Sequence, residues 1–312
     1  MSKKNKFYML AGLPGSGKSS LAKKITEETN RHAETVLIGS DRIREELFGD
    51  ASVQDDPDRV FGLMRARTLK ALKSGRDVIY DACNVSSKRR RVFLQNLKKL
   101  DCEKICIITG TPFDLCLARN AARHRVVPEE VIERMYTTWK TPAFFEGWDD
   151  IRIHYADGAR NAFGDAHEFV MKYLDYDQMN PHHKETLGTH MLNTQANIIK
   201  NGYAPESDLA LAALLHDCGK PFTKTMEQTD DGAVAHYYQH DCVGAYNALF
   251  FDYHGKTEKD ILDVSLLINL HMYPFFWHGR GQARLRRLWG QELYDAVLLL
   301  HNADRKASVS AV

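Results

Sequence analysis

The chain has 312 residues, enough for two domains of ordinary size, and 44% of them are hydrophobic, as in globular proteins. Its 42 Lys and Arg residues nearly balance 41 Asp and Glu residues, which argues against unspecific coating of nucleic acid. The six cysteines are scattered without a paired CxxC framework, which fits a reducing cytosol. Residues 1–6 are basic, but the apolar stretch after them is too short for a signal peptide or membrane helix. We therefore expect a cytoplasmic protein with no membrane segment.

The first motif is a complete phosphate-binding loop, Gly-Leu-Pro-Gly-Ser-Gly-Lys-Ser at residues 12–19. The apolar run 7–11 predicts a buried strand before it, and residues 19–25 predict a helix start, which is the context this motif needs. Loop N–H groups and the helix N-terminus would point at phosphate, Lys18 would bridge the outer phosphates, and the Ser19 hydroxyl would ligate Mg²⁺. We expect ATP or another nucleoside triphosphate at Gly12, Gly15, Ser16, Gly17, Lys18, Ser19 and Ser20.

The second predicted strand, residues 35–39, ends in a pair of candidate acceptor-site residues. Ligands of open α/β sheets bind beyond the carboxyl ends of the strands. Asp41 sits where a carboxylate could take the proton of an attacking hydroxyl, and Arg44, one helical turn on, could hold a phosphate of the acceptor. The simpler interpretation of Asp41 is a helix N-cap, and both roles can coexist.

The third predicted strand, residues 77–81, adds further polar groups at the same edge. Asp81 could orient a water on Mg²⁺ or Lys18, and Asn84 could place the acceptor. Four cations follow at residues 88–91, where contact with a polyanion and a solvated helix face are equally open interpretations.

A fourth strand is predicted at residues 104–108, followed by a helix that carries residues 119–125. Arg119 and Arg123 are four apart, so we expect them on one helix face. This is the layout of a mobile lid that brings arginine onto the transferring phosphoryl group.

The segment from about residue 6 to residue 155 resembles the phage-type polynucleotide 5′-hydroxyl kinase family. The resemblance is carried by residues 12–19, Asp41 with Arg44, residues 81–84, residues 88–90, Arg119-Asn120 with Arg123, and Val127-Pro128. It implies Asp41 as general base, Arg44 as a contact to the acceptor, and Arg123 as the lid residue on the donor phosphates. We accordingly expect Arg119 on the nucleotide and Arg89 on the substrate. Cys83 stands where the family usually has Thr, which leaves the hydrogen bonding there open.

A fifth strand is predicted at residues 151–155, and residues 166–174 predict a helix that closes the first domain. The polar stretch 175–181, which carries a proline, predicts the boundary. We thus expect an α/β P-loop NTPase domain over 1–175, with a parallel sheet flanked by helices, and an all-α domain over 176–312.

The second domain contains a pattern of metal-ligand residue types. An apolar run at 209–215 predicts a buried helix that leads directly into His216-Asp217. An imidazole nitrogen and a carboxylate oxygen suit Mn²⁺, Fe²⁺, Co²⁺, Ni²⁺ or Zn²⁺. Further candidates could project from helices into a shared bundle core. They are His190, His240, His271 and Asp304.

Residues 182–310 resemble the HD superfamily of metal-dependent phosphohydrolases, through His190, His216-Asp217, Gly219-Lys220 and Asp304. The stretch 236–245 is closer still to the HD domain attached to bacterial tRNA nucleotidyltransferases. The resemblance implies one ion on His190, His216, Asp217 and Asp304, and a second that shares Asp217 and uses His240 and His271. It also implies a water activated by the ions and Lys220 on the substrate phosphate. His236 is the weaker competitor for the role of His240, and we treat His182, His183 and His301 as non-ligands.

Together the two resemblances imply an enzyme that corrects nucleic-acid ends, on RNA or on DNA. The first domain would phosphorylate a 5′-hydroxyl, and the second would remove a 2′,3′-cyclic phosphate or a 3′- or 2′-phosphate. Partners would be RNA ends, including tRNA fragments, and a downstream ligase. The alternatives are a nucleoside or metabolite kinase fused to an HD nucleotide phosphohydrolase, and a nucleotide-gated binding module without catalysis. Bases could also stack on residues 275–277 beside the basic stretch 280–287, although core packing is the more common fate of such aromatics.

Overall fold

The computed structural model describes residues 4–29, 34–180, 185–230, 232–277 and 279–309. The chain forms two compact units. The first comprises Met1–Met135 and Pro142–Asp157, and the second comprises Tyr136–Thr141 and Gly158–Val312. We predicted the boundary at residues 175–181, whereas the units divide after Asp157.

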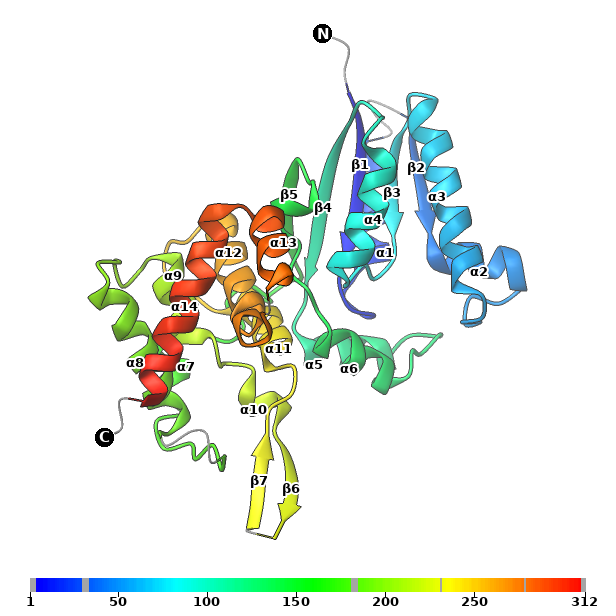
Figure 1. The fold of residues 1–312 in the computed structure, drawn as a ribbon. Helices are drawn as coiled ribbons and strands as arrows, with labels where there is room; N and C mark the ends of the chain where they lie inside the picture. The colour runs from blue at the N-terminus through cyan, green and yellow to red at the C-terminus, as the bar shows by residue number, and fades with distance from the viewer. Residues whose placement is uncertain (1–3, 30–33, 181–184, 231, 278, 310–312) are drawn as a thin grey trace. The chain divides into compact units, whose positions relative to one another are not determined.

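The first unit is built on a parallel sheet of five strands in the order β2-β3-β1-β4-β5 (Figure 1). The strands are β1 (Asn5–Ala11), β2 (Thr35–Gly39), β3 (Asp77–Asp81), β4 (Cys102–Gly110) and β5 (Asp150–Tyr155). Leu10 of β1 and Gly39 of β2 both lie in register with Asp81 of β3, so the carboxyl ends of these strands meet at one edge. The predicted parallel α/β sheet is confirmed. Strands β1, β3 and β4 are largely buried apolar runs, whereas β5 alternates buried and exposed residues.

Helices flank this sheet (Figure 1). They are α1 (Lys18–Thr29), α2 (Ser40–Phe48), α3 (Pro57–Lys73), α4 (Ser87–Leu97), α5 (Phe113–Ala121), α6 (Glu129–Thr137) and the short η1 (Phe144–Glu146). Leu21 and Ala22 of α1 pack on Tyr8, Leu10 and Ile79 of the sheet. This packing fixes the start of α1 directly after the phosphate loop.

The second unit is mostly helical. Its helices are α7 (Ala166–Met171), α8 (Leu187–Lys200), α9 (Asp208–Leu215), α10 (Lys220–Thr223), α11 (His240–Asn247), η2 (Ala248–Phe250), α12 (Glu258–Leu270), η3 (Tyr273–Phe276), α13 (Arg280–Trp289) and α14 (Gln291–Val309). Every residue of α9 after Asp208 is buried, as its apolar sequence predicts. Ser207 caps α9, and Thr257 and Asp260 form a capping box that begins α12.

Two features of this unit differ from prediction. Strands β6 (Thr225–Thr229) and β7 (Gly232–His236) form an antiparallel hairpin, so the all-α prediction is wrong for this stretch. All of β6 is exposed and its sequence is polar, so no apolar pattern marks it as a strand. Helix α7 belongs to the second unit instead of closing the first, because Phe169 packs against Phe251 with ring centroids 4.8 Å apart.

The segment Tyr136–Thr141 lies in the second unit although the chain on both sides of it belongs to the first. Trp139 is fully buried there, edge-on to Tyr246 at 5.1 Å. The Tyr136 hydroxyl donates to Asn247 Oδ1 over 2.6 Å. Asn269 Nδ2 donates to the Trp139 carbonyl over 3.2 Å. The segment is therefore part of the second unit's core and is no surface linker.

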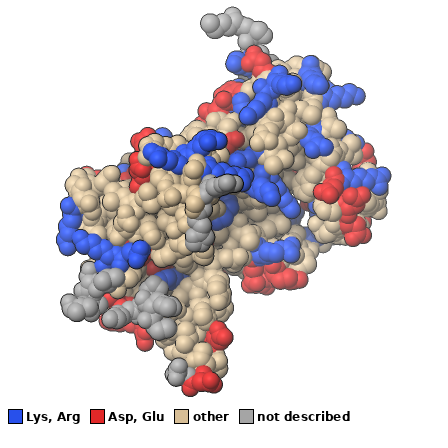
Figure 2. All heavy atoms as spheres, viewed as in Figure 1, with Lys and Arg blue, Asp and Glu red and all other residues tan. Residues whose placement is uncertain are grey.

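Both acidic and basic side chains appear on the face in Figure 2. Within the described part of the chain, no helix combines the length and the apolar character that crossing a bilayer requires.

Candidate active sites

The phosphate loop lies between β1 and α1, and its shape depends on glycine. Gly15 has φ +82°, and a Cβ there would lie 2.2 Å from the Cys116 carbonyl oxygen, so no side chain fits. Lys18 is buried, and its ammonium donates to the carbonyls of Gly12 at 3.0 Å and Leu13 at 2.7 Å. The loop thus holds the Lys18 ammonium among backbone carbonyls, where a triphosphate could accept hydrogen bonds from it.

The three serines of the predicted nucleotide site, Ser16, Ser19 and Ser20, lie in different environments. The Ser19 hydroxyl donates to Asp81 Oδ2 over 2.8 Å, which joins the end of β3 to the start of α1. Burial raises the pKa of Asp81, although the charge of Lys18 opposes the shift. A hydroxyl beside a carboxylate is the donor set that Mg²⁺ takes at such loops. Ser16 is anchored on Thr109 through their hydroxyls at 2.6 Å, and Ser20 is exposed on α1.

Asp41 occupies the first turn of α2, and Gly39 is the N-cap, so the capping role predicted for Asp41 is wrong. Its half-exposed carboxylate pairs with Arg125 Nη1 at 2.6 Å and with Arg44 Nη1 at 3.4 Å. Arg44 is buried, and burial lowers the pKa of its guanidinium. Sequence reasoning missed Arg125, because only the fold brings it to Asp41.

The predicted lid differs from a single helix. Helix α5 ends at Ala121 and α6 begins at Glu129, so Arg119 lies on α5 while Arg123 lies beyond its end, and the predicted shared face is wrong. The Asn120 side chain donates to the Val127 carbonyl and accepts from the Val127 N–H, at 2.8 and 3.0 Å. These bonds replace the next helical turn. Arg123 is exposed on the resulting loop.

The basic stretch at residues 88–91 is divided between a structural and an exposed role. Arg90 is fully buried, with Nε and Nη2 on the two Glu146 oxygens at 2.8 and 2.7 Å and Nη1 on the Asn84 carbonyl at 2.8 Å. It therefore cannot contact a polyanion as one of four cations. Arg89 is exposed. The Asn84 amide donates to the Leu10 carbonyl over 2.6 Å, which ties it to the end of β1.

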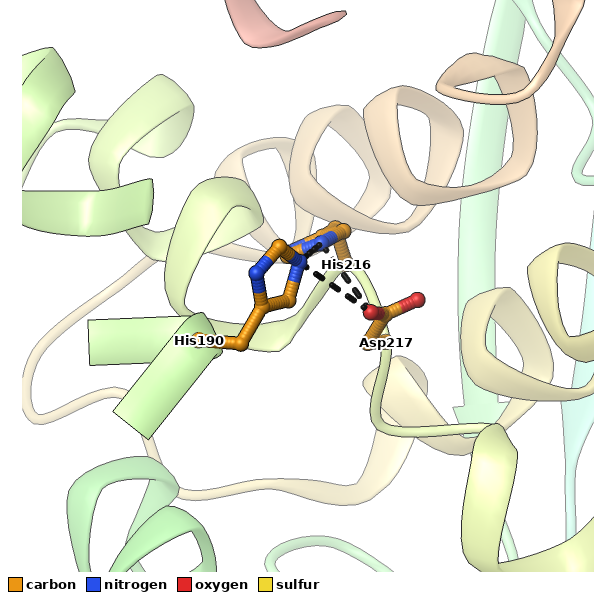
Figure 3. A group of neighbouring side chains, drawn as sticks. All are labelled: His190, His216 and Asp217. Carbon is orange, nitrogen blue, oxygen red and sulfur yellow. Dashed lines mark hydrogen bonds and ion pairs between the residues drawn. The ribbon is translucent and has the colours of Figure 1, made fainter. Parts of the chain in front are cut away.

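In the second unit, His190 of α8, His216 and Asp217 converge in the interior (Figure 3). His190 Nε2 and His216 Nε2 lie 3.2 Å apart, and they are 3.5 and 3.3 Å from Asp217 Oδ2. Asp304 Oδ1, from α14, lies 3.1 Å from His190 Nε2 and 3.7 Å from His216 Nε2. The fold thus brings all four residues of the first predicted ligand set together.

A second group shares Asp217. Its other oxygen, Oδ1, lies 3.2 Å from His240 Nε2, which is itself 3.2 Å from His271 Nε2. Asp217, His240 and His271 are all buried. Asp217 therefore presents one oxygen to each group, as the predicted shared ligand would.

The imidazoles of these groups are oriented by the backbone. Nδ1 of His216, His240 and His271 lies 2.7–2.8 Å from the carbonyl three residues earlier in the chain. Such a bond fixes the proton on Nδ1 and leaves the Nε2 lone pair free for an ion. Burial, with the neighbouring imidazoles, lowers the pKa of His271 to about 4, so this ring is neutral as a ligand must be.

Lys220 and Gly219 support Asp217 from the following turn. Lys220 is buried, and its ammonium lies 2.8 Å from Asp217 Oδ2 and donates to Gln178 Oε1 over 2.7 Å. Although burial alone would raise the pKa of Asp217, Lys220 and the histidines hold it well below its usual range. A Cβ on Gly219 would lie 2.1 Å from the His240 carbonyl oxygen, so glycine permits the two ligand-bearing segments to approach.

The remaining histidines take other positions. His236 pairs with Glu227 at 2.8 Å and is absent from both ligand groups, and the ring of His301 packs against Phe275. His182 and His183 lie outside the described residues. A cavity of about 630 Å³ opens beside the ligand groups, and Asp217, Lys220, His240, His271 and Asp304 contribute to its lining.

Comparison with known proteins concerns less than half of the chain. Residues 8–142 match the family described as AAA domain. The L-seryl-tRNA(Sec) kinase of Methanococcus maripaludis is 29% identical over 144 residues, which are 45% of this chain and 55% of that protein. The chain thus spans about half the length of the curated relative it matches.

Two similar solved structures are a Pnkp1/Rnl/Hen1 complex and a gluconokinase from Sinorhizobium meliloti 1021. The first is 24% identical with a TM-score of 0.34, covering 41% of this chain and 42% of that one. The second is 16% identical with a TM-score of 0.35, covering 49% of this chain and 84% of that one. Residues 8–142 therefore combine a phosphate loop and a parallel sheet with a match to the AAA domain family.

Proposed function

We propose that this chain is a nucleic-acid end-healing enzyme that acts on RNA. The first unit would transfer the γ-phosphate of ATP to a 5′-hydroxyl. The second would hydrolyse a 2′,3′-cyclic phosphate or a terminal 3′- or 2′-phosphate. The observation that carries the proposal is the presence in one chain of a phosphate loop with a candidate base and of two ligand groups that share Asp217.

The kinase step rests on residues at the carboxyl edge of the sheet. Lys18 would exchange its bonds to loop carbonyls for bonds to the triphosphate, and Ser19 with Asp81 would hold Mg²⁺. Asp41 would accept the proton of the 5′-hydroxyl while the hydroxyl oxygen forms a bond to the γ-phosphorus. The bond between the γ-phosphorus and the β-phosphate oxygen would break in the same step. Arg44 and Arg125 orient the Asp41 carboxylate for this role.

The hydrolytic step rests on the chemistry of the second unit's donors. Three imidazoles have Nδ1 bonded to a backbone carbonyl, which leaves Nε2 to bind an ion. The Asp217 carboxylate belongs to both ligand groups. Such donors fit a pair of ions such as Mn²⁺, Fe²⁺, Co²⁺, Ni²⁺ or Zn²⁺. Ions bound there would polarise the phosphoryl group and lower the pKa of water. Lys220 would hold Asp217 in place and offer its charge to the substrate phosphate.

The kinase step would leave a 5′-phosphate. Hydrolysis of a cyclic phosphate would first open it to a 2′- or 3′-phosphate, and a second hydrolysis would release that phosphate and leave a 2′,3′-diol. These are the groups from which an RNA ligase forms a phosphodiester bond. We therefore propose a ligase as the downstream partner and RNA fragments, including those of tRNA, as substrates.

The test uses an RNA oligonucleotide with a 5′-hydroxyl and a 2′,3′-cyclic phosphate, incubated with ATP, Mg²⁺ and Mn²⁺, Ni²⁺ or Co²⁺. We expect the wild-type protein to change both ends. Lys18→Ala should lose only the 5′ reaction, and the double variant His216→Ala/Asp217→Ala only the 3′ reaction. If neither end changes while free nucleosides and nucleotides react, the chain is a small-molecule enzyme and the proposal is wrong.

A further inference from the structure

The cavity beside the ligand groups extends to side chains outside both groups. These are Asn180, His236, Tyr237, Tyr238, Met272, Phe275, Arg305 and Ser308. Its volume of about 630 Å³ lies in the range that holds a ligand of nucleotide size. The cavity is therefore larger than a phosphate group needs, and its additional lining includes aromatic side chains and one arginine.

Tyr238 presents an aromatic surface at this cavity. Its side chain is 70% exposed, although large aromatic rings are usually buried. The ring stacks on His236, with centroids 5.4 Å apart and planes 5° from parallel. Oε2 of Glu227, on β6, lies 2.8 Å from His236 Nε2. One face of the Tyr238 ring is thus supported, and its exposure leaves the other for a planar ligand.

One arginine, Arg305, lines the same cavity as this aromatic surface. Arg305 follows Asp304 on α14, lines the cavity, is exposed, and forms no ion pair with any residue that the structure describes. An exposed arginine that follows Asp304 directly and lines the cavity suits a phosphodiester next to the reacting phosphate.

We propose that this cavity binds the 3′-terminal nucleotide of single-stranded RNA, with its base stacked on Tyr238 and Arg305 on the phosphodiester immediately upstream. The inference rests on the proposed hydrolytic function of the second unit and names its substrate. Stacking accepts any base because each has a planar face, so the site selects an unpaired strand end and not a sequence. Oligonucleotides are then better substrates than mononucleotides.

The test compares 3′-phosphate release from matched substrates. Tyr238→Ala should raise KM about 5- to 100-fold for an RNA oligonucleotide, because the stacking of one base on an aromatic ring increases affinity by about that factor. It should leave KM unchanged for the same oligonucleotide with an abasic 3′-terminal ribose. Tyr238→Phe should behave as wild type. Phe276→Ala is the matched control, because Phe276 is 72% exposed but does not line the cavity.

Arg305→Ala supplies an independent arm. It should raise KM for a dinucleotide 3′-phosphate and leave KM unchanged for a nucleoside 3′-monophosphate, which has no upstream phosphate. Equal losses on the abasic and normal substrates for Tyr238→Ala, or on both substrates for Arg305→Ala, would overturn the inference.

A binding measurement separates this inference from the proposed activity. Fluorescence anisotropy of a labelled single-stranded RNA, added to the protein without metal, reports binding without turnover. Binding that Tyr238→Ala weakens, in a protein that hydrolyses no phosphate, would refute the hydrolytic function and keep the RNA site. Hydrolysis that is indifferent to Tyr238 and Arg305 would keep the function and refute the site.

Discussion

Trp139 should stabilise the second unit and not the first, although the sequence on both sides of it belongs to the first. A buried tryptophan removes roughly 200 Å² of surface from water, which at about 25 cal/mol per Å² corresponds to about 5 kcal/mol. Truncations of buried Trp to Ala cost about 3–5 kcal/mol in practice. The Trp139 indole N–H also donates to Thr141 Oγ1 over 3.3 Å, and Trp139→Ala removes that bond.

The assay is hydrogen–deuterium exchange resolved by peptide. A loss of about 3–5 kcal/mol should speed exchange in α9 and α12 by about a hundredfold to several thousandfold, because those amides exchange through opening of the second unit. Trp148→Ala is the matched control: Trp148 is also buried and donates to Glu146 Oε2 over 2.9 Å, but it lies in the first unit. It should speed exchange in β1 and β4 instead. Faster exchange of β1 and β4 in Trp139→Ala, with α9 and α12 unaffected, would refute the assignment of this segment.

Three further predictions concern the buried ion pair of the first unit and the two sites. Arg90→Met should lower the free energy of unfolding, measured by urea titration, by about 3–5 kcal/mol, because it leaves the Glu146 carboxylate buried without its ion-pair partner. Adding Glu146→Leu should restore most of this loss. A double variant that is no more stable than Arg90→Met would contradict this reason. Asp41→Asn should slow the turnover of RNA phosphorylation about 10²- to 10⁴-fold while equilibrium dialysis shows unchanged ATP binding, and an undiminished turnover rate would exclude Asp41 as the base. Mass spectrometry of the metal-loaded protein should count two ions per chain, with one in His271→Ala and none after chelation; a single ion in the wild type would contradict the shared role of Asp217.

The parts of the fold that were predictable are those encoded locally. The phosphate loop and the five strands of the first sheet are contiguous patterns, which are apolar runs in β1, β3 and β4 and an alternation of apolar and polar residues in β5. The ligand candidates His216, His240 and His271 were recognisable because each lies at the end of a helix or next to one. Their convergence on Asp217 depends on how the helices pack, which the sequence alone showed only through resemblance.

The parts that were missed depend on contacts distant in the chain. Arg125 reaches Asp41 only because the chain leaves the helix after Ala121, where the Asn120 side chain replaces a helical turn. In the run of charges at residues 88–91, the sequence did not distinguish the buried Arg90 from its neighbours, because its partner Glu146 is 56 residues away. The hairpin of β6 and β7 lacks an apolar alternation, so its strands had no signal to detect.

The path of the chain through Tyr136–Thr141 also restricts how such a protein can arise or be rebuilt by recombination. A gene fusion that joins two independent modules leaves a single junction, and each module can later be exchanged by one crossover. Here the first unit is interrupted by six residues of the second, from Tyr136 to Thr141, so a crossover near residue 157 would leave these core residues with the wrong partner. A new second unit would have to arrive with its own matching segment, so a single crossover would not exchange it.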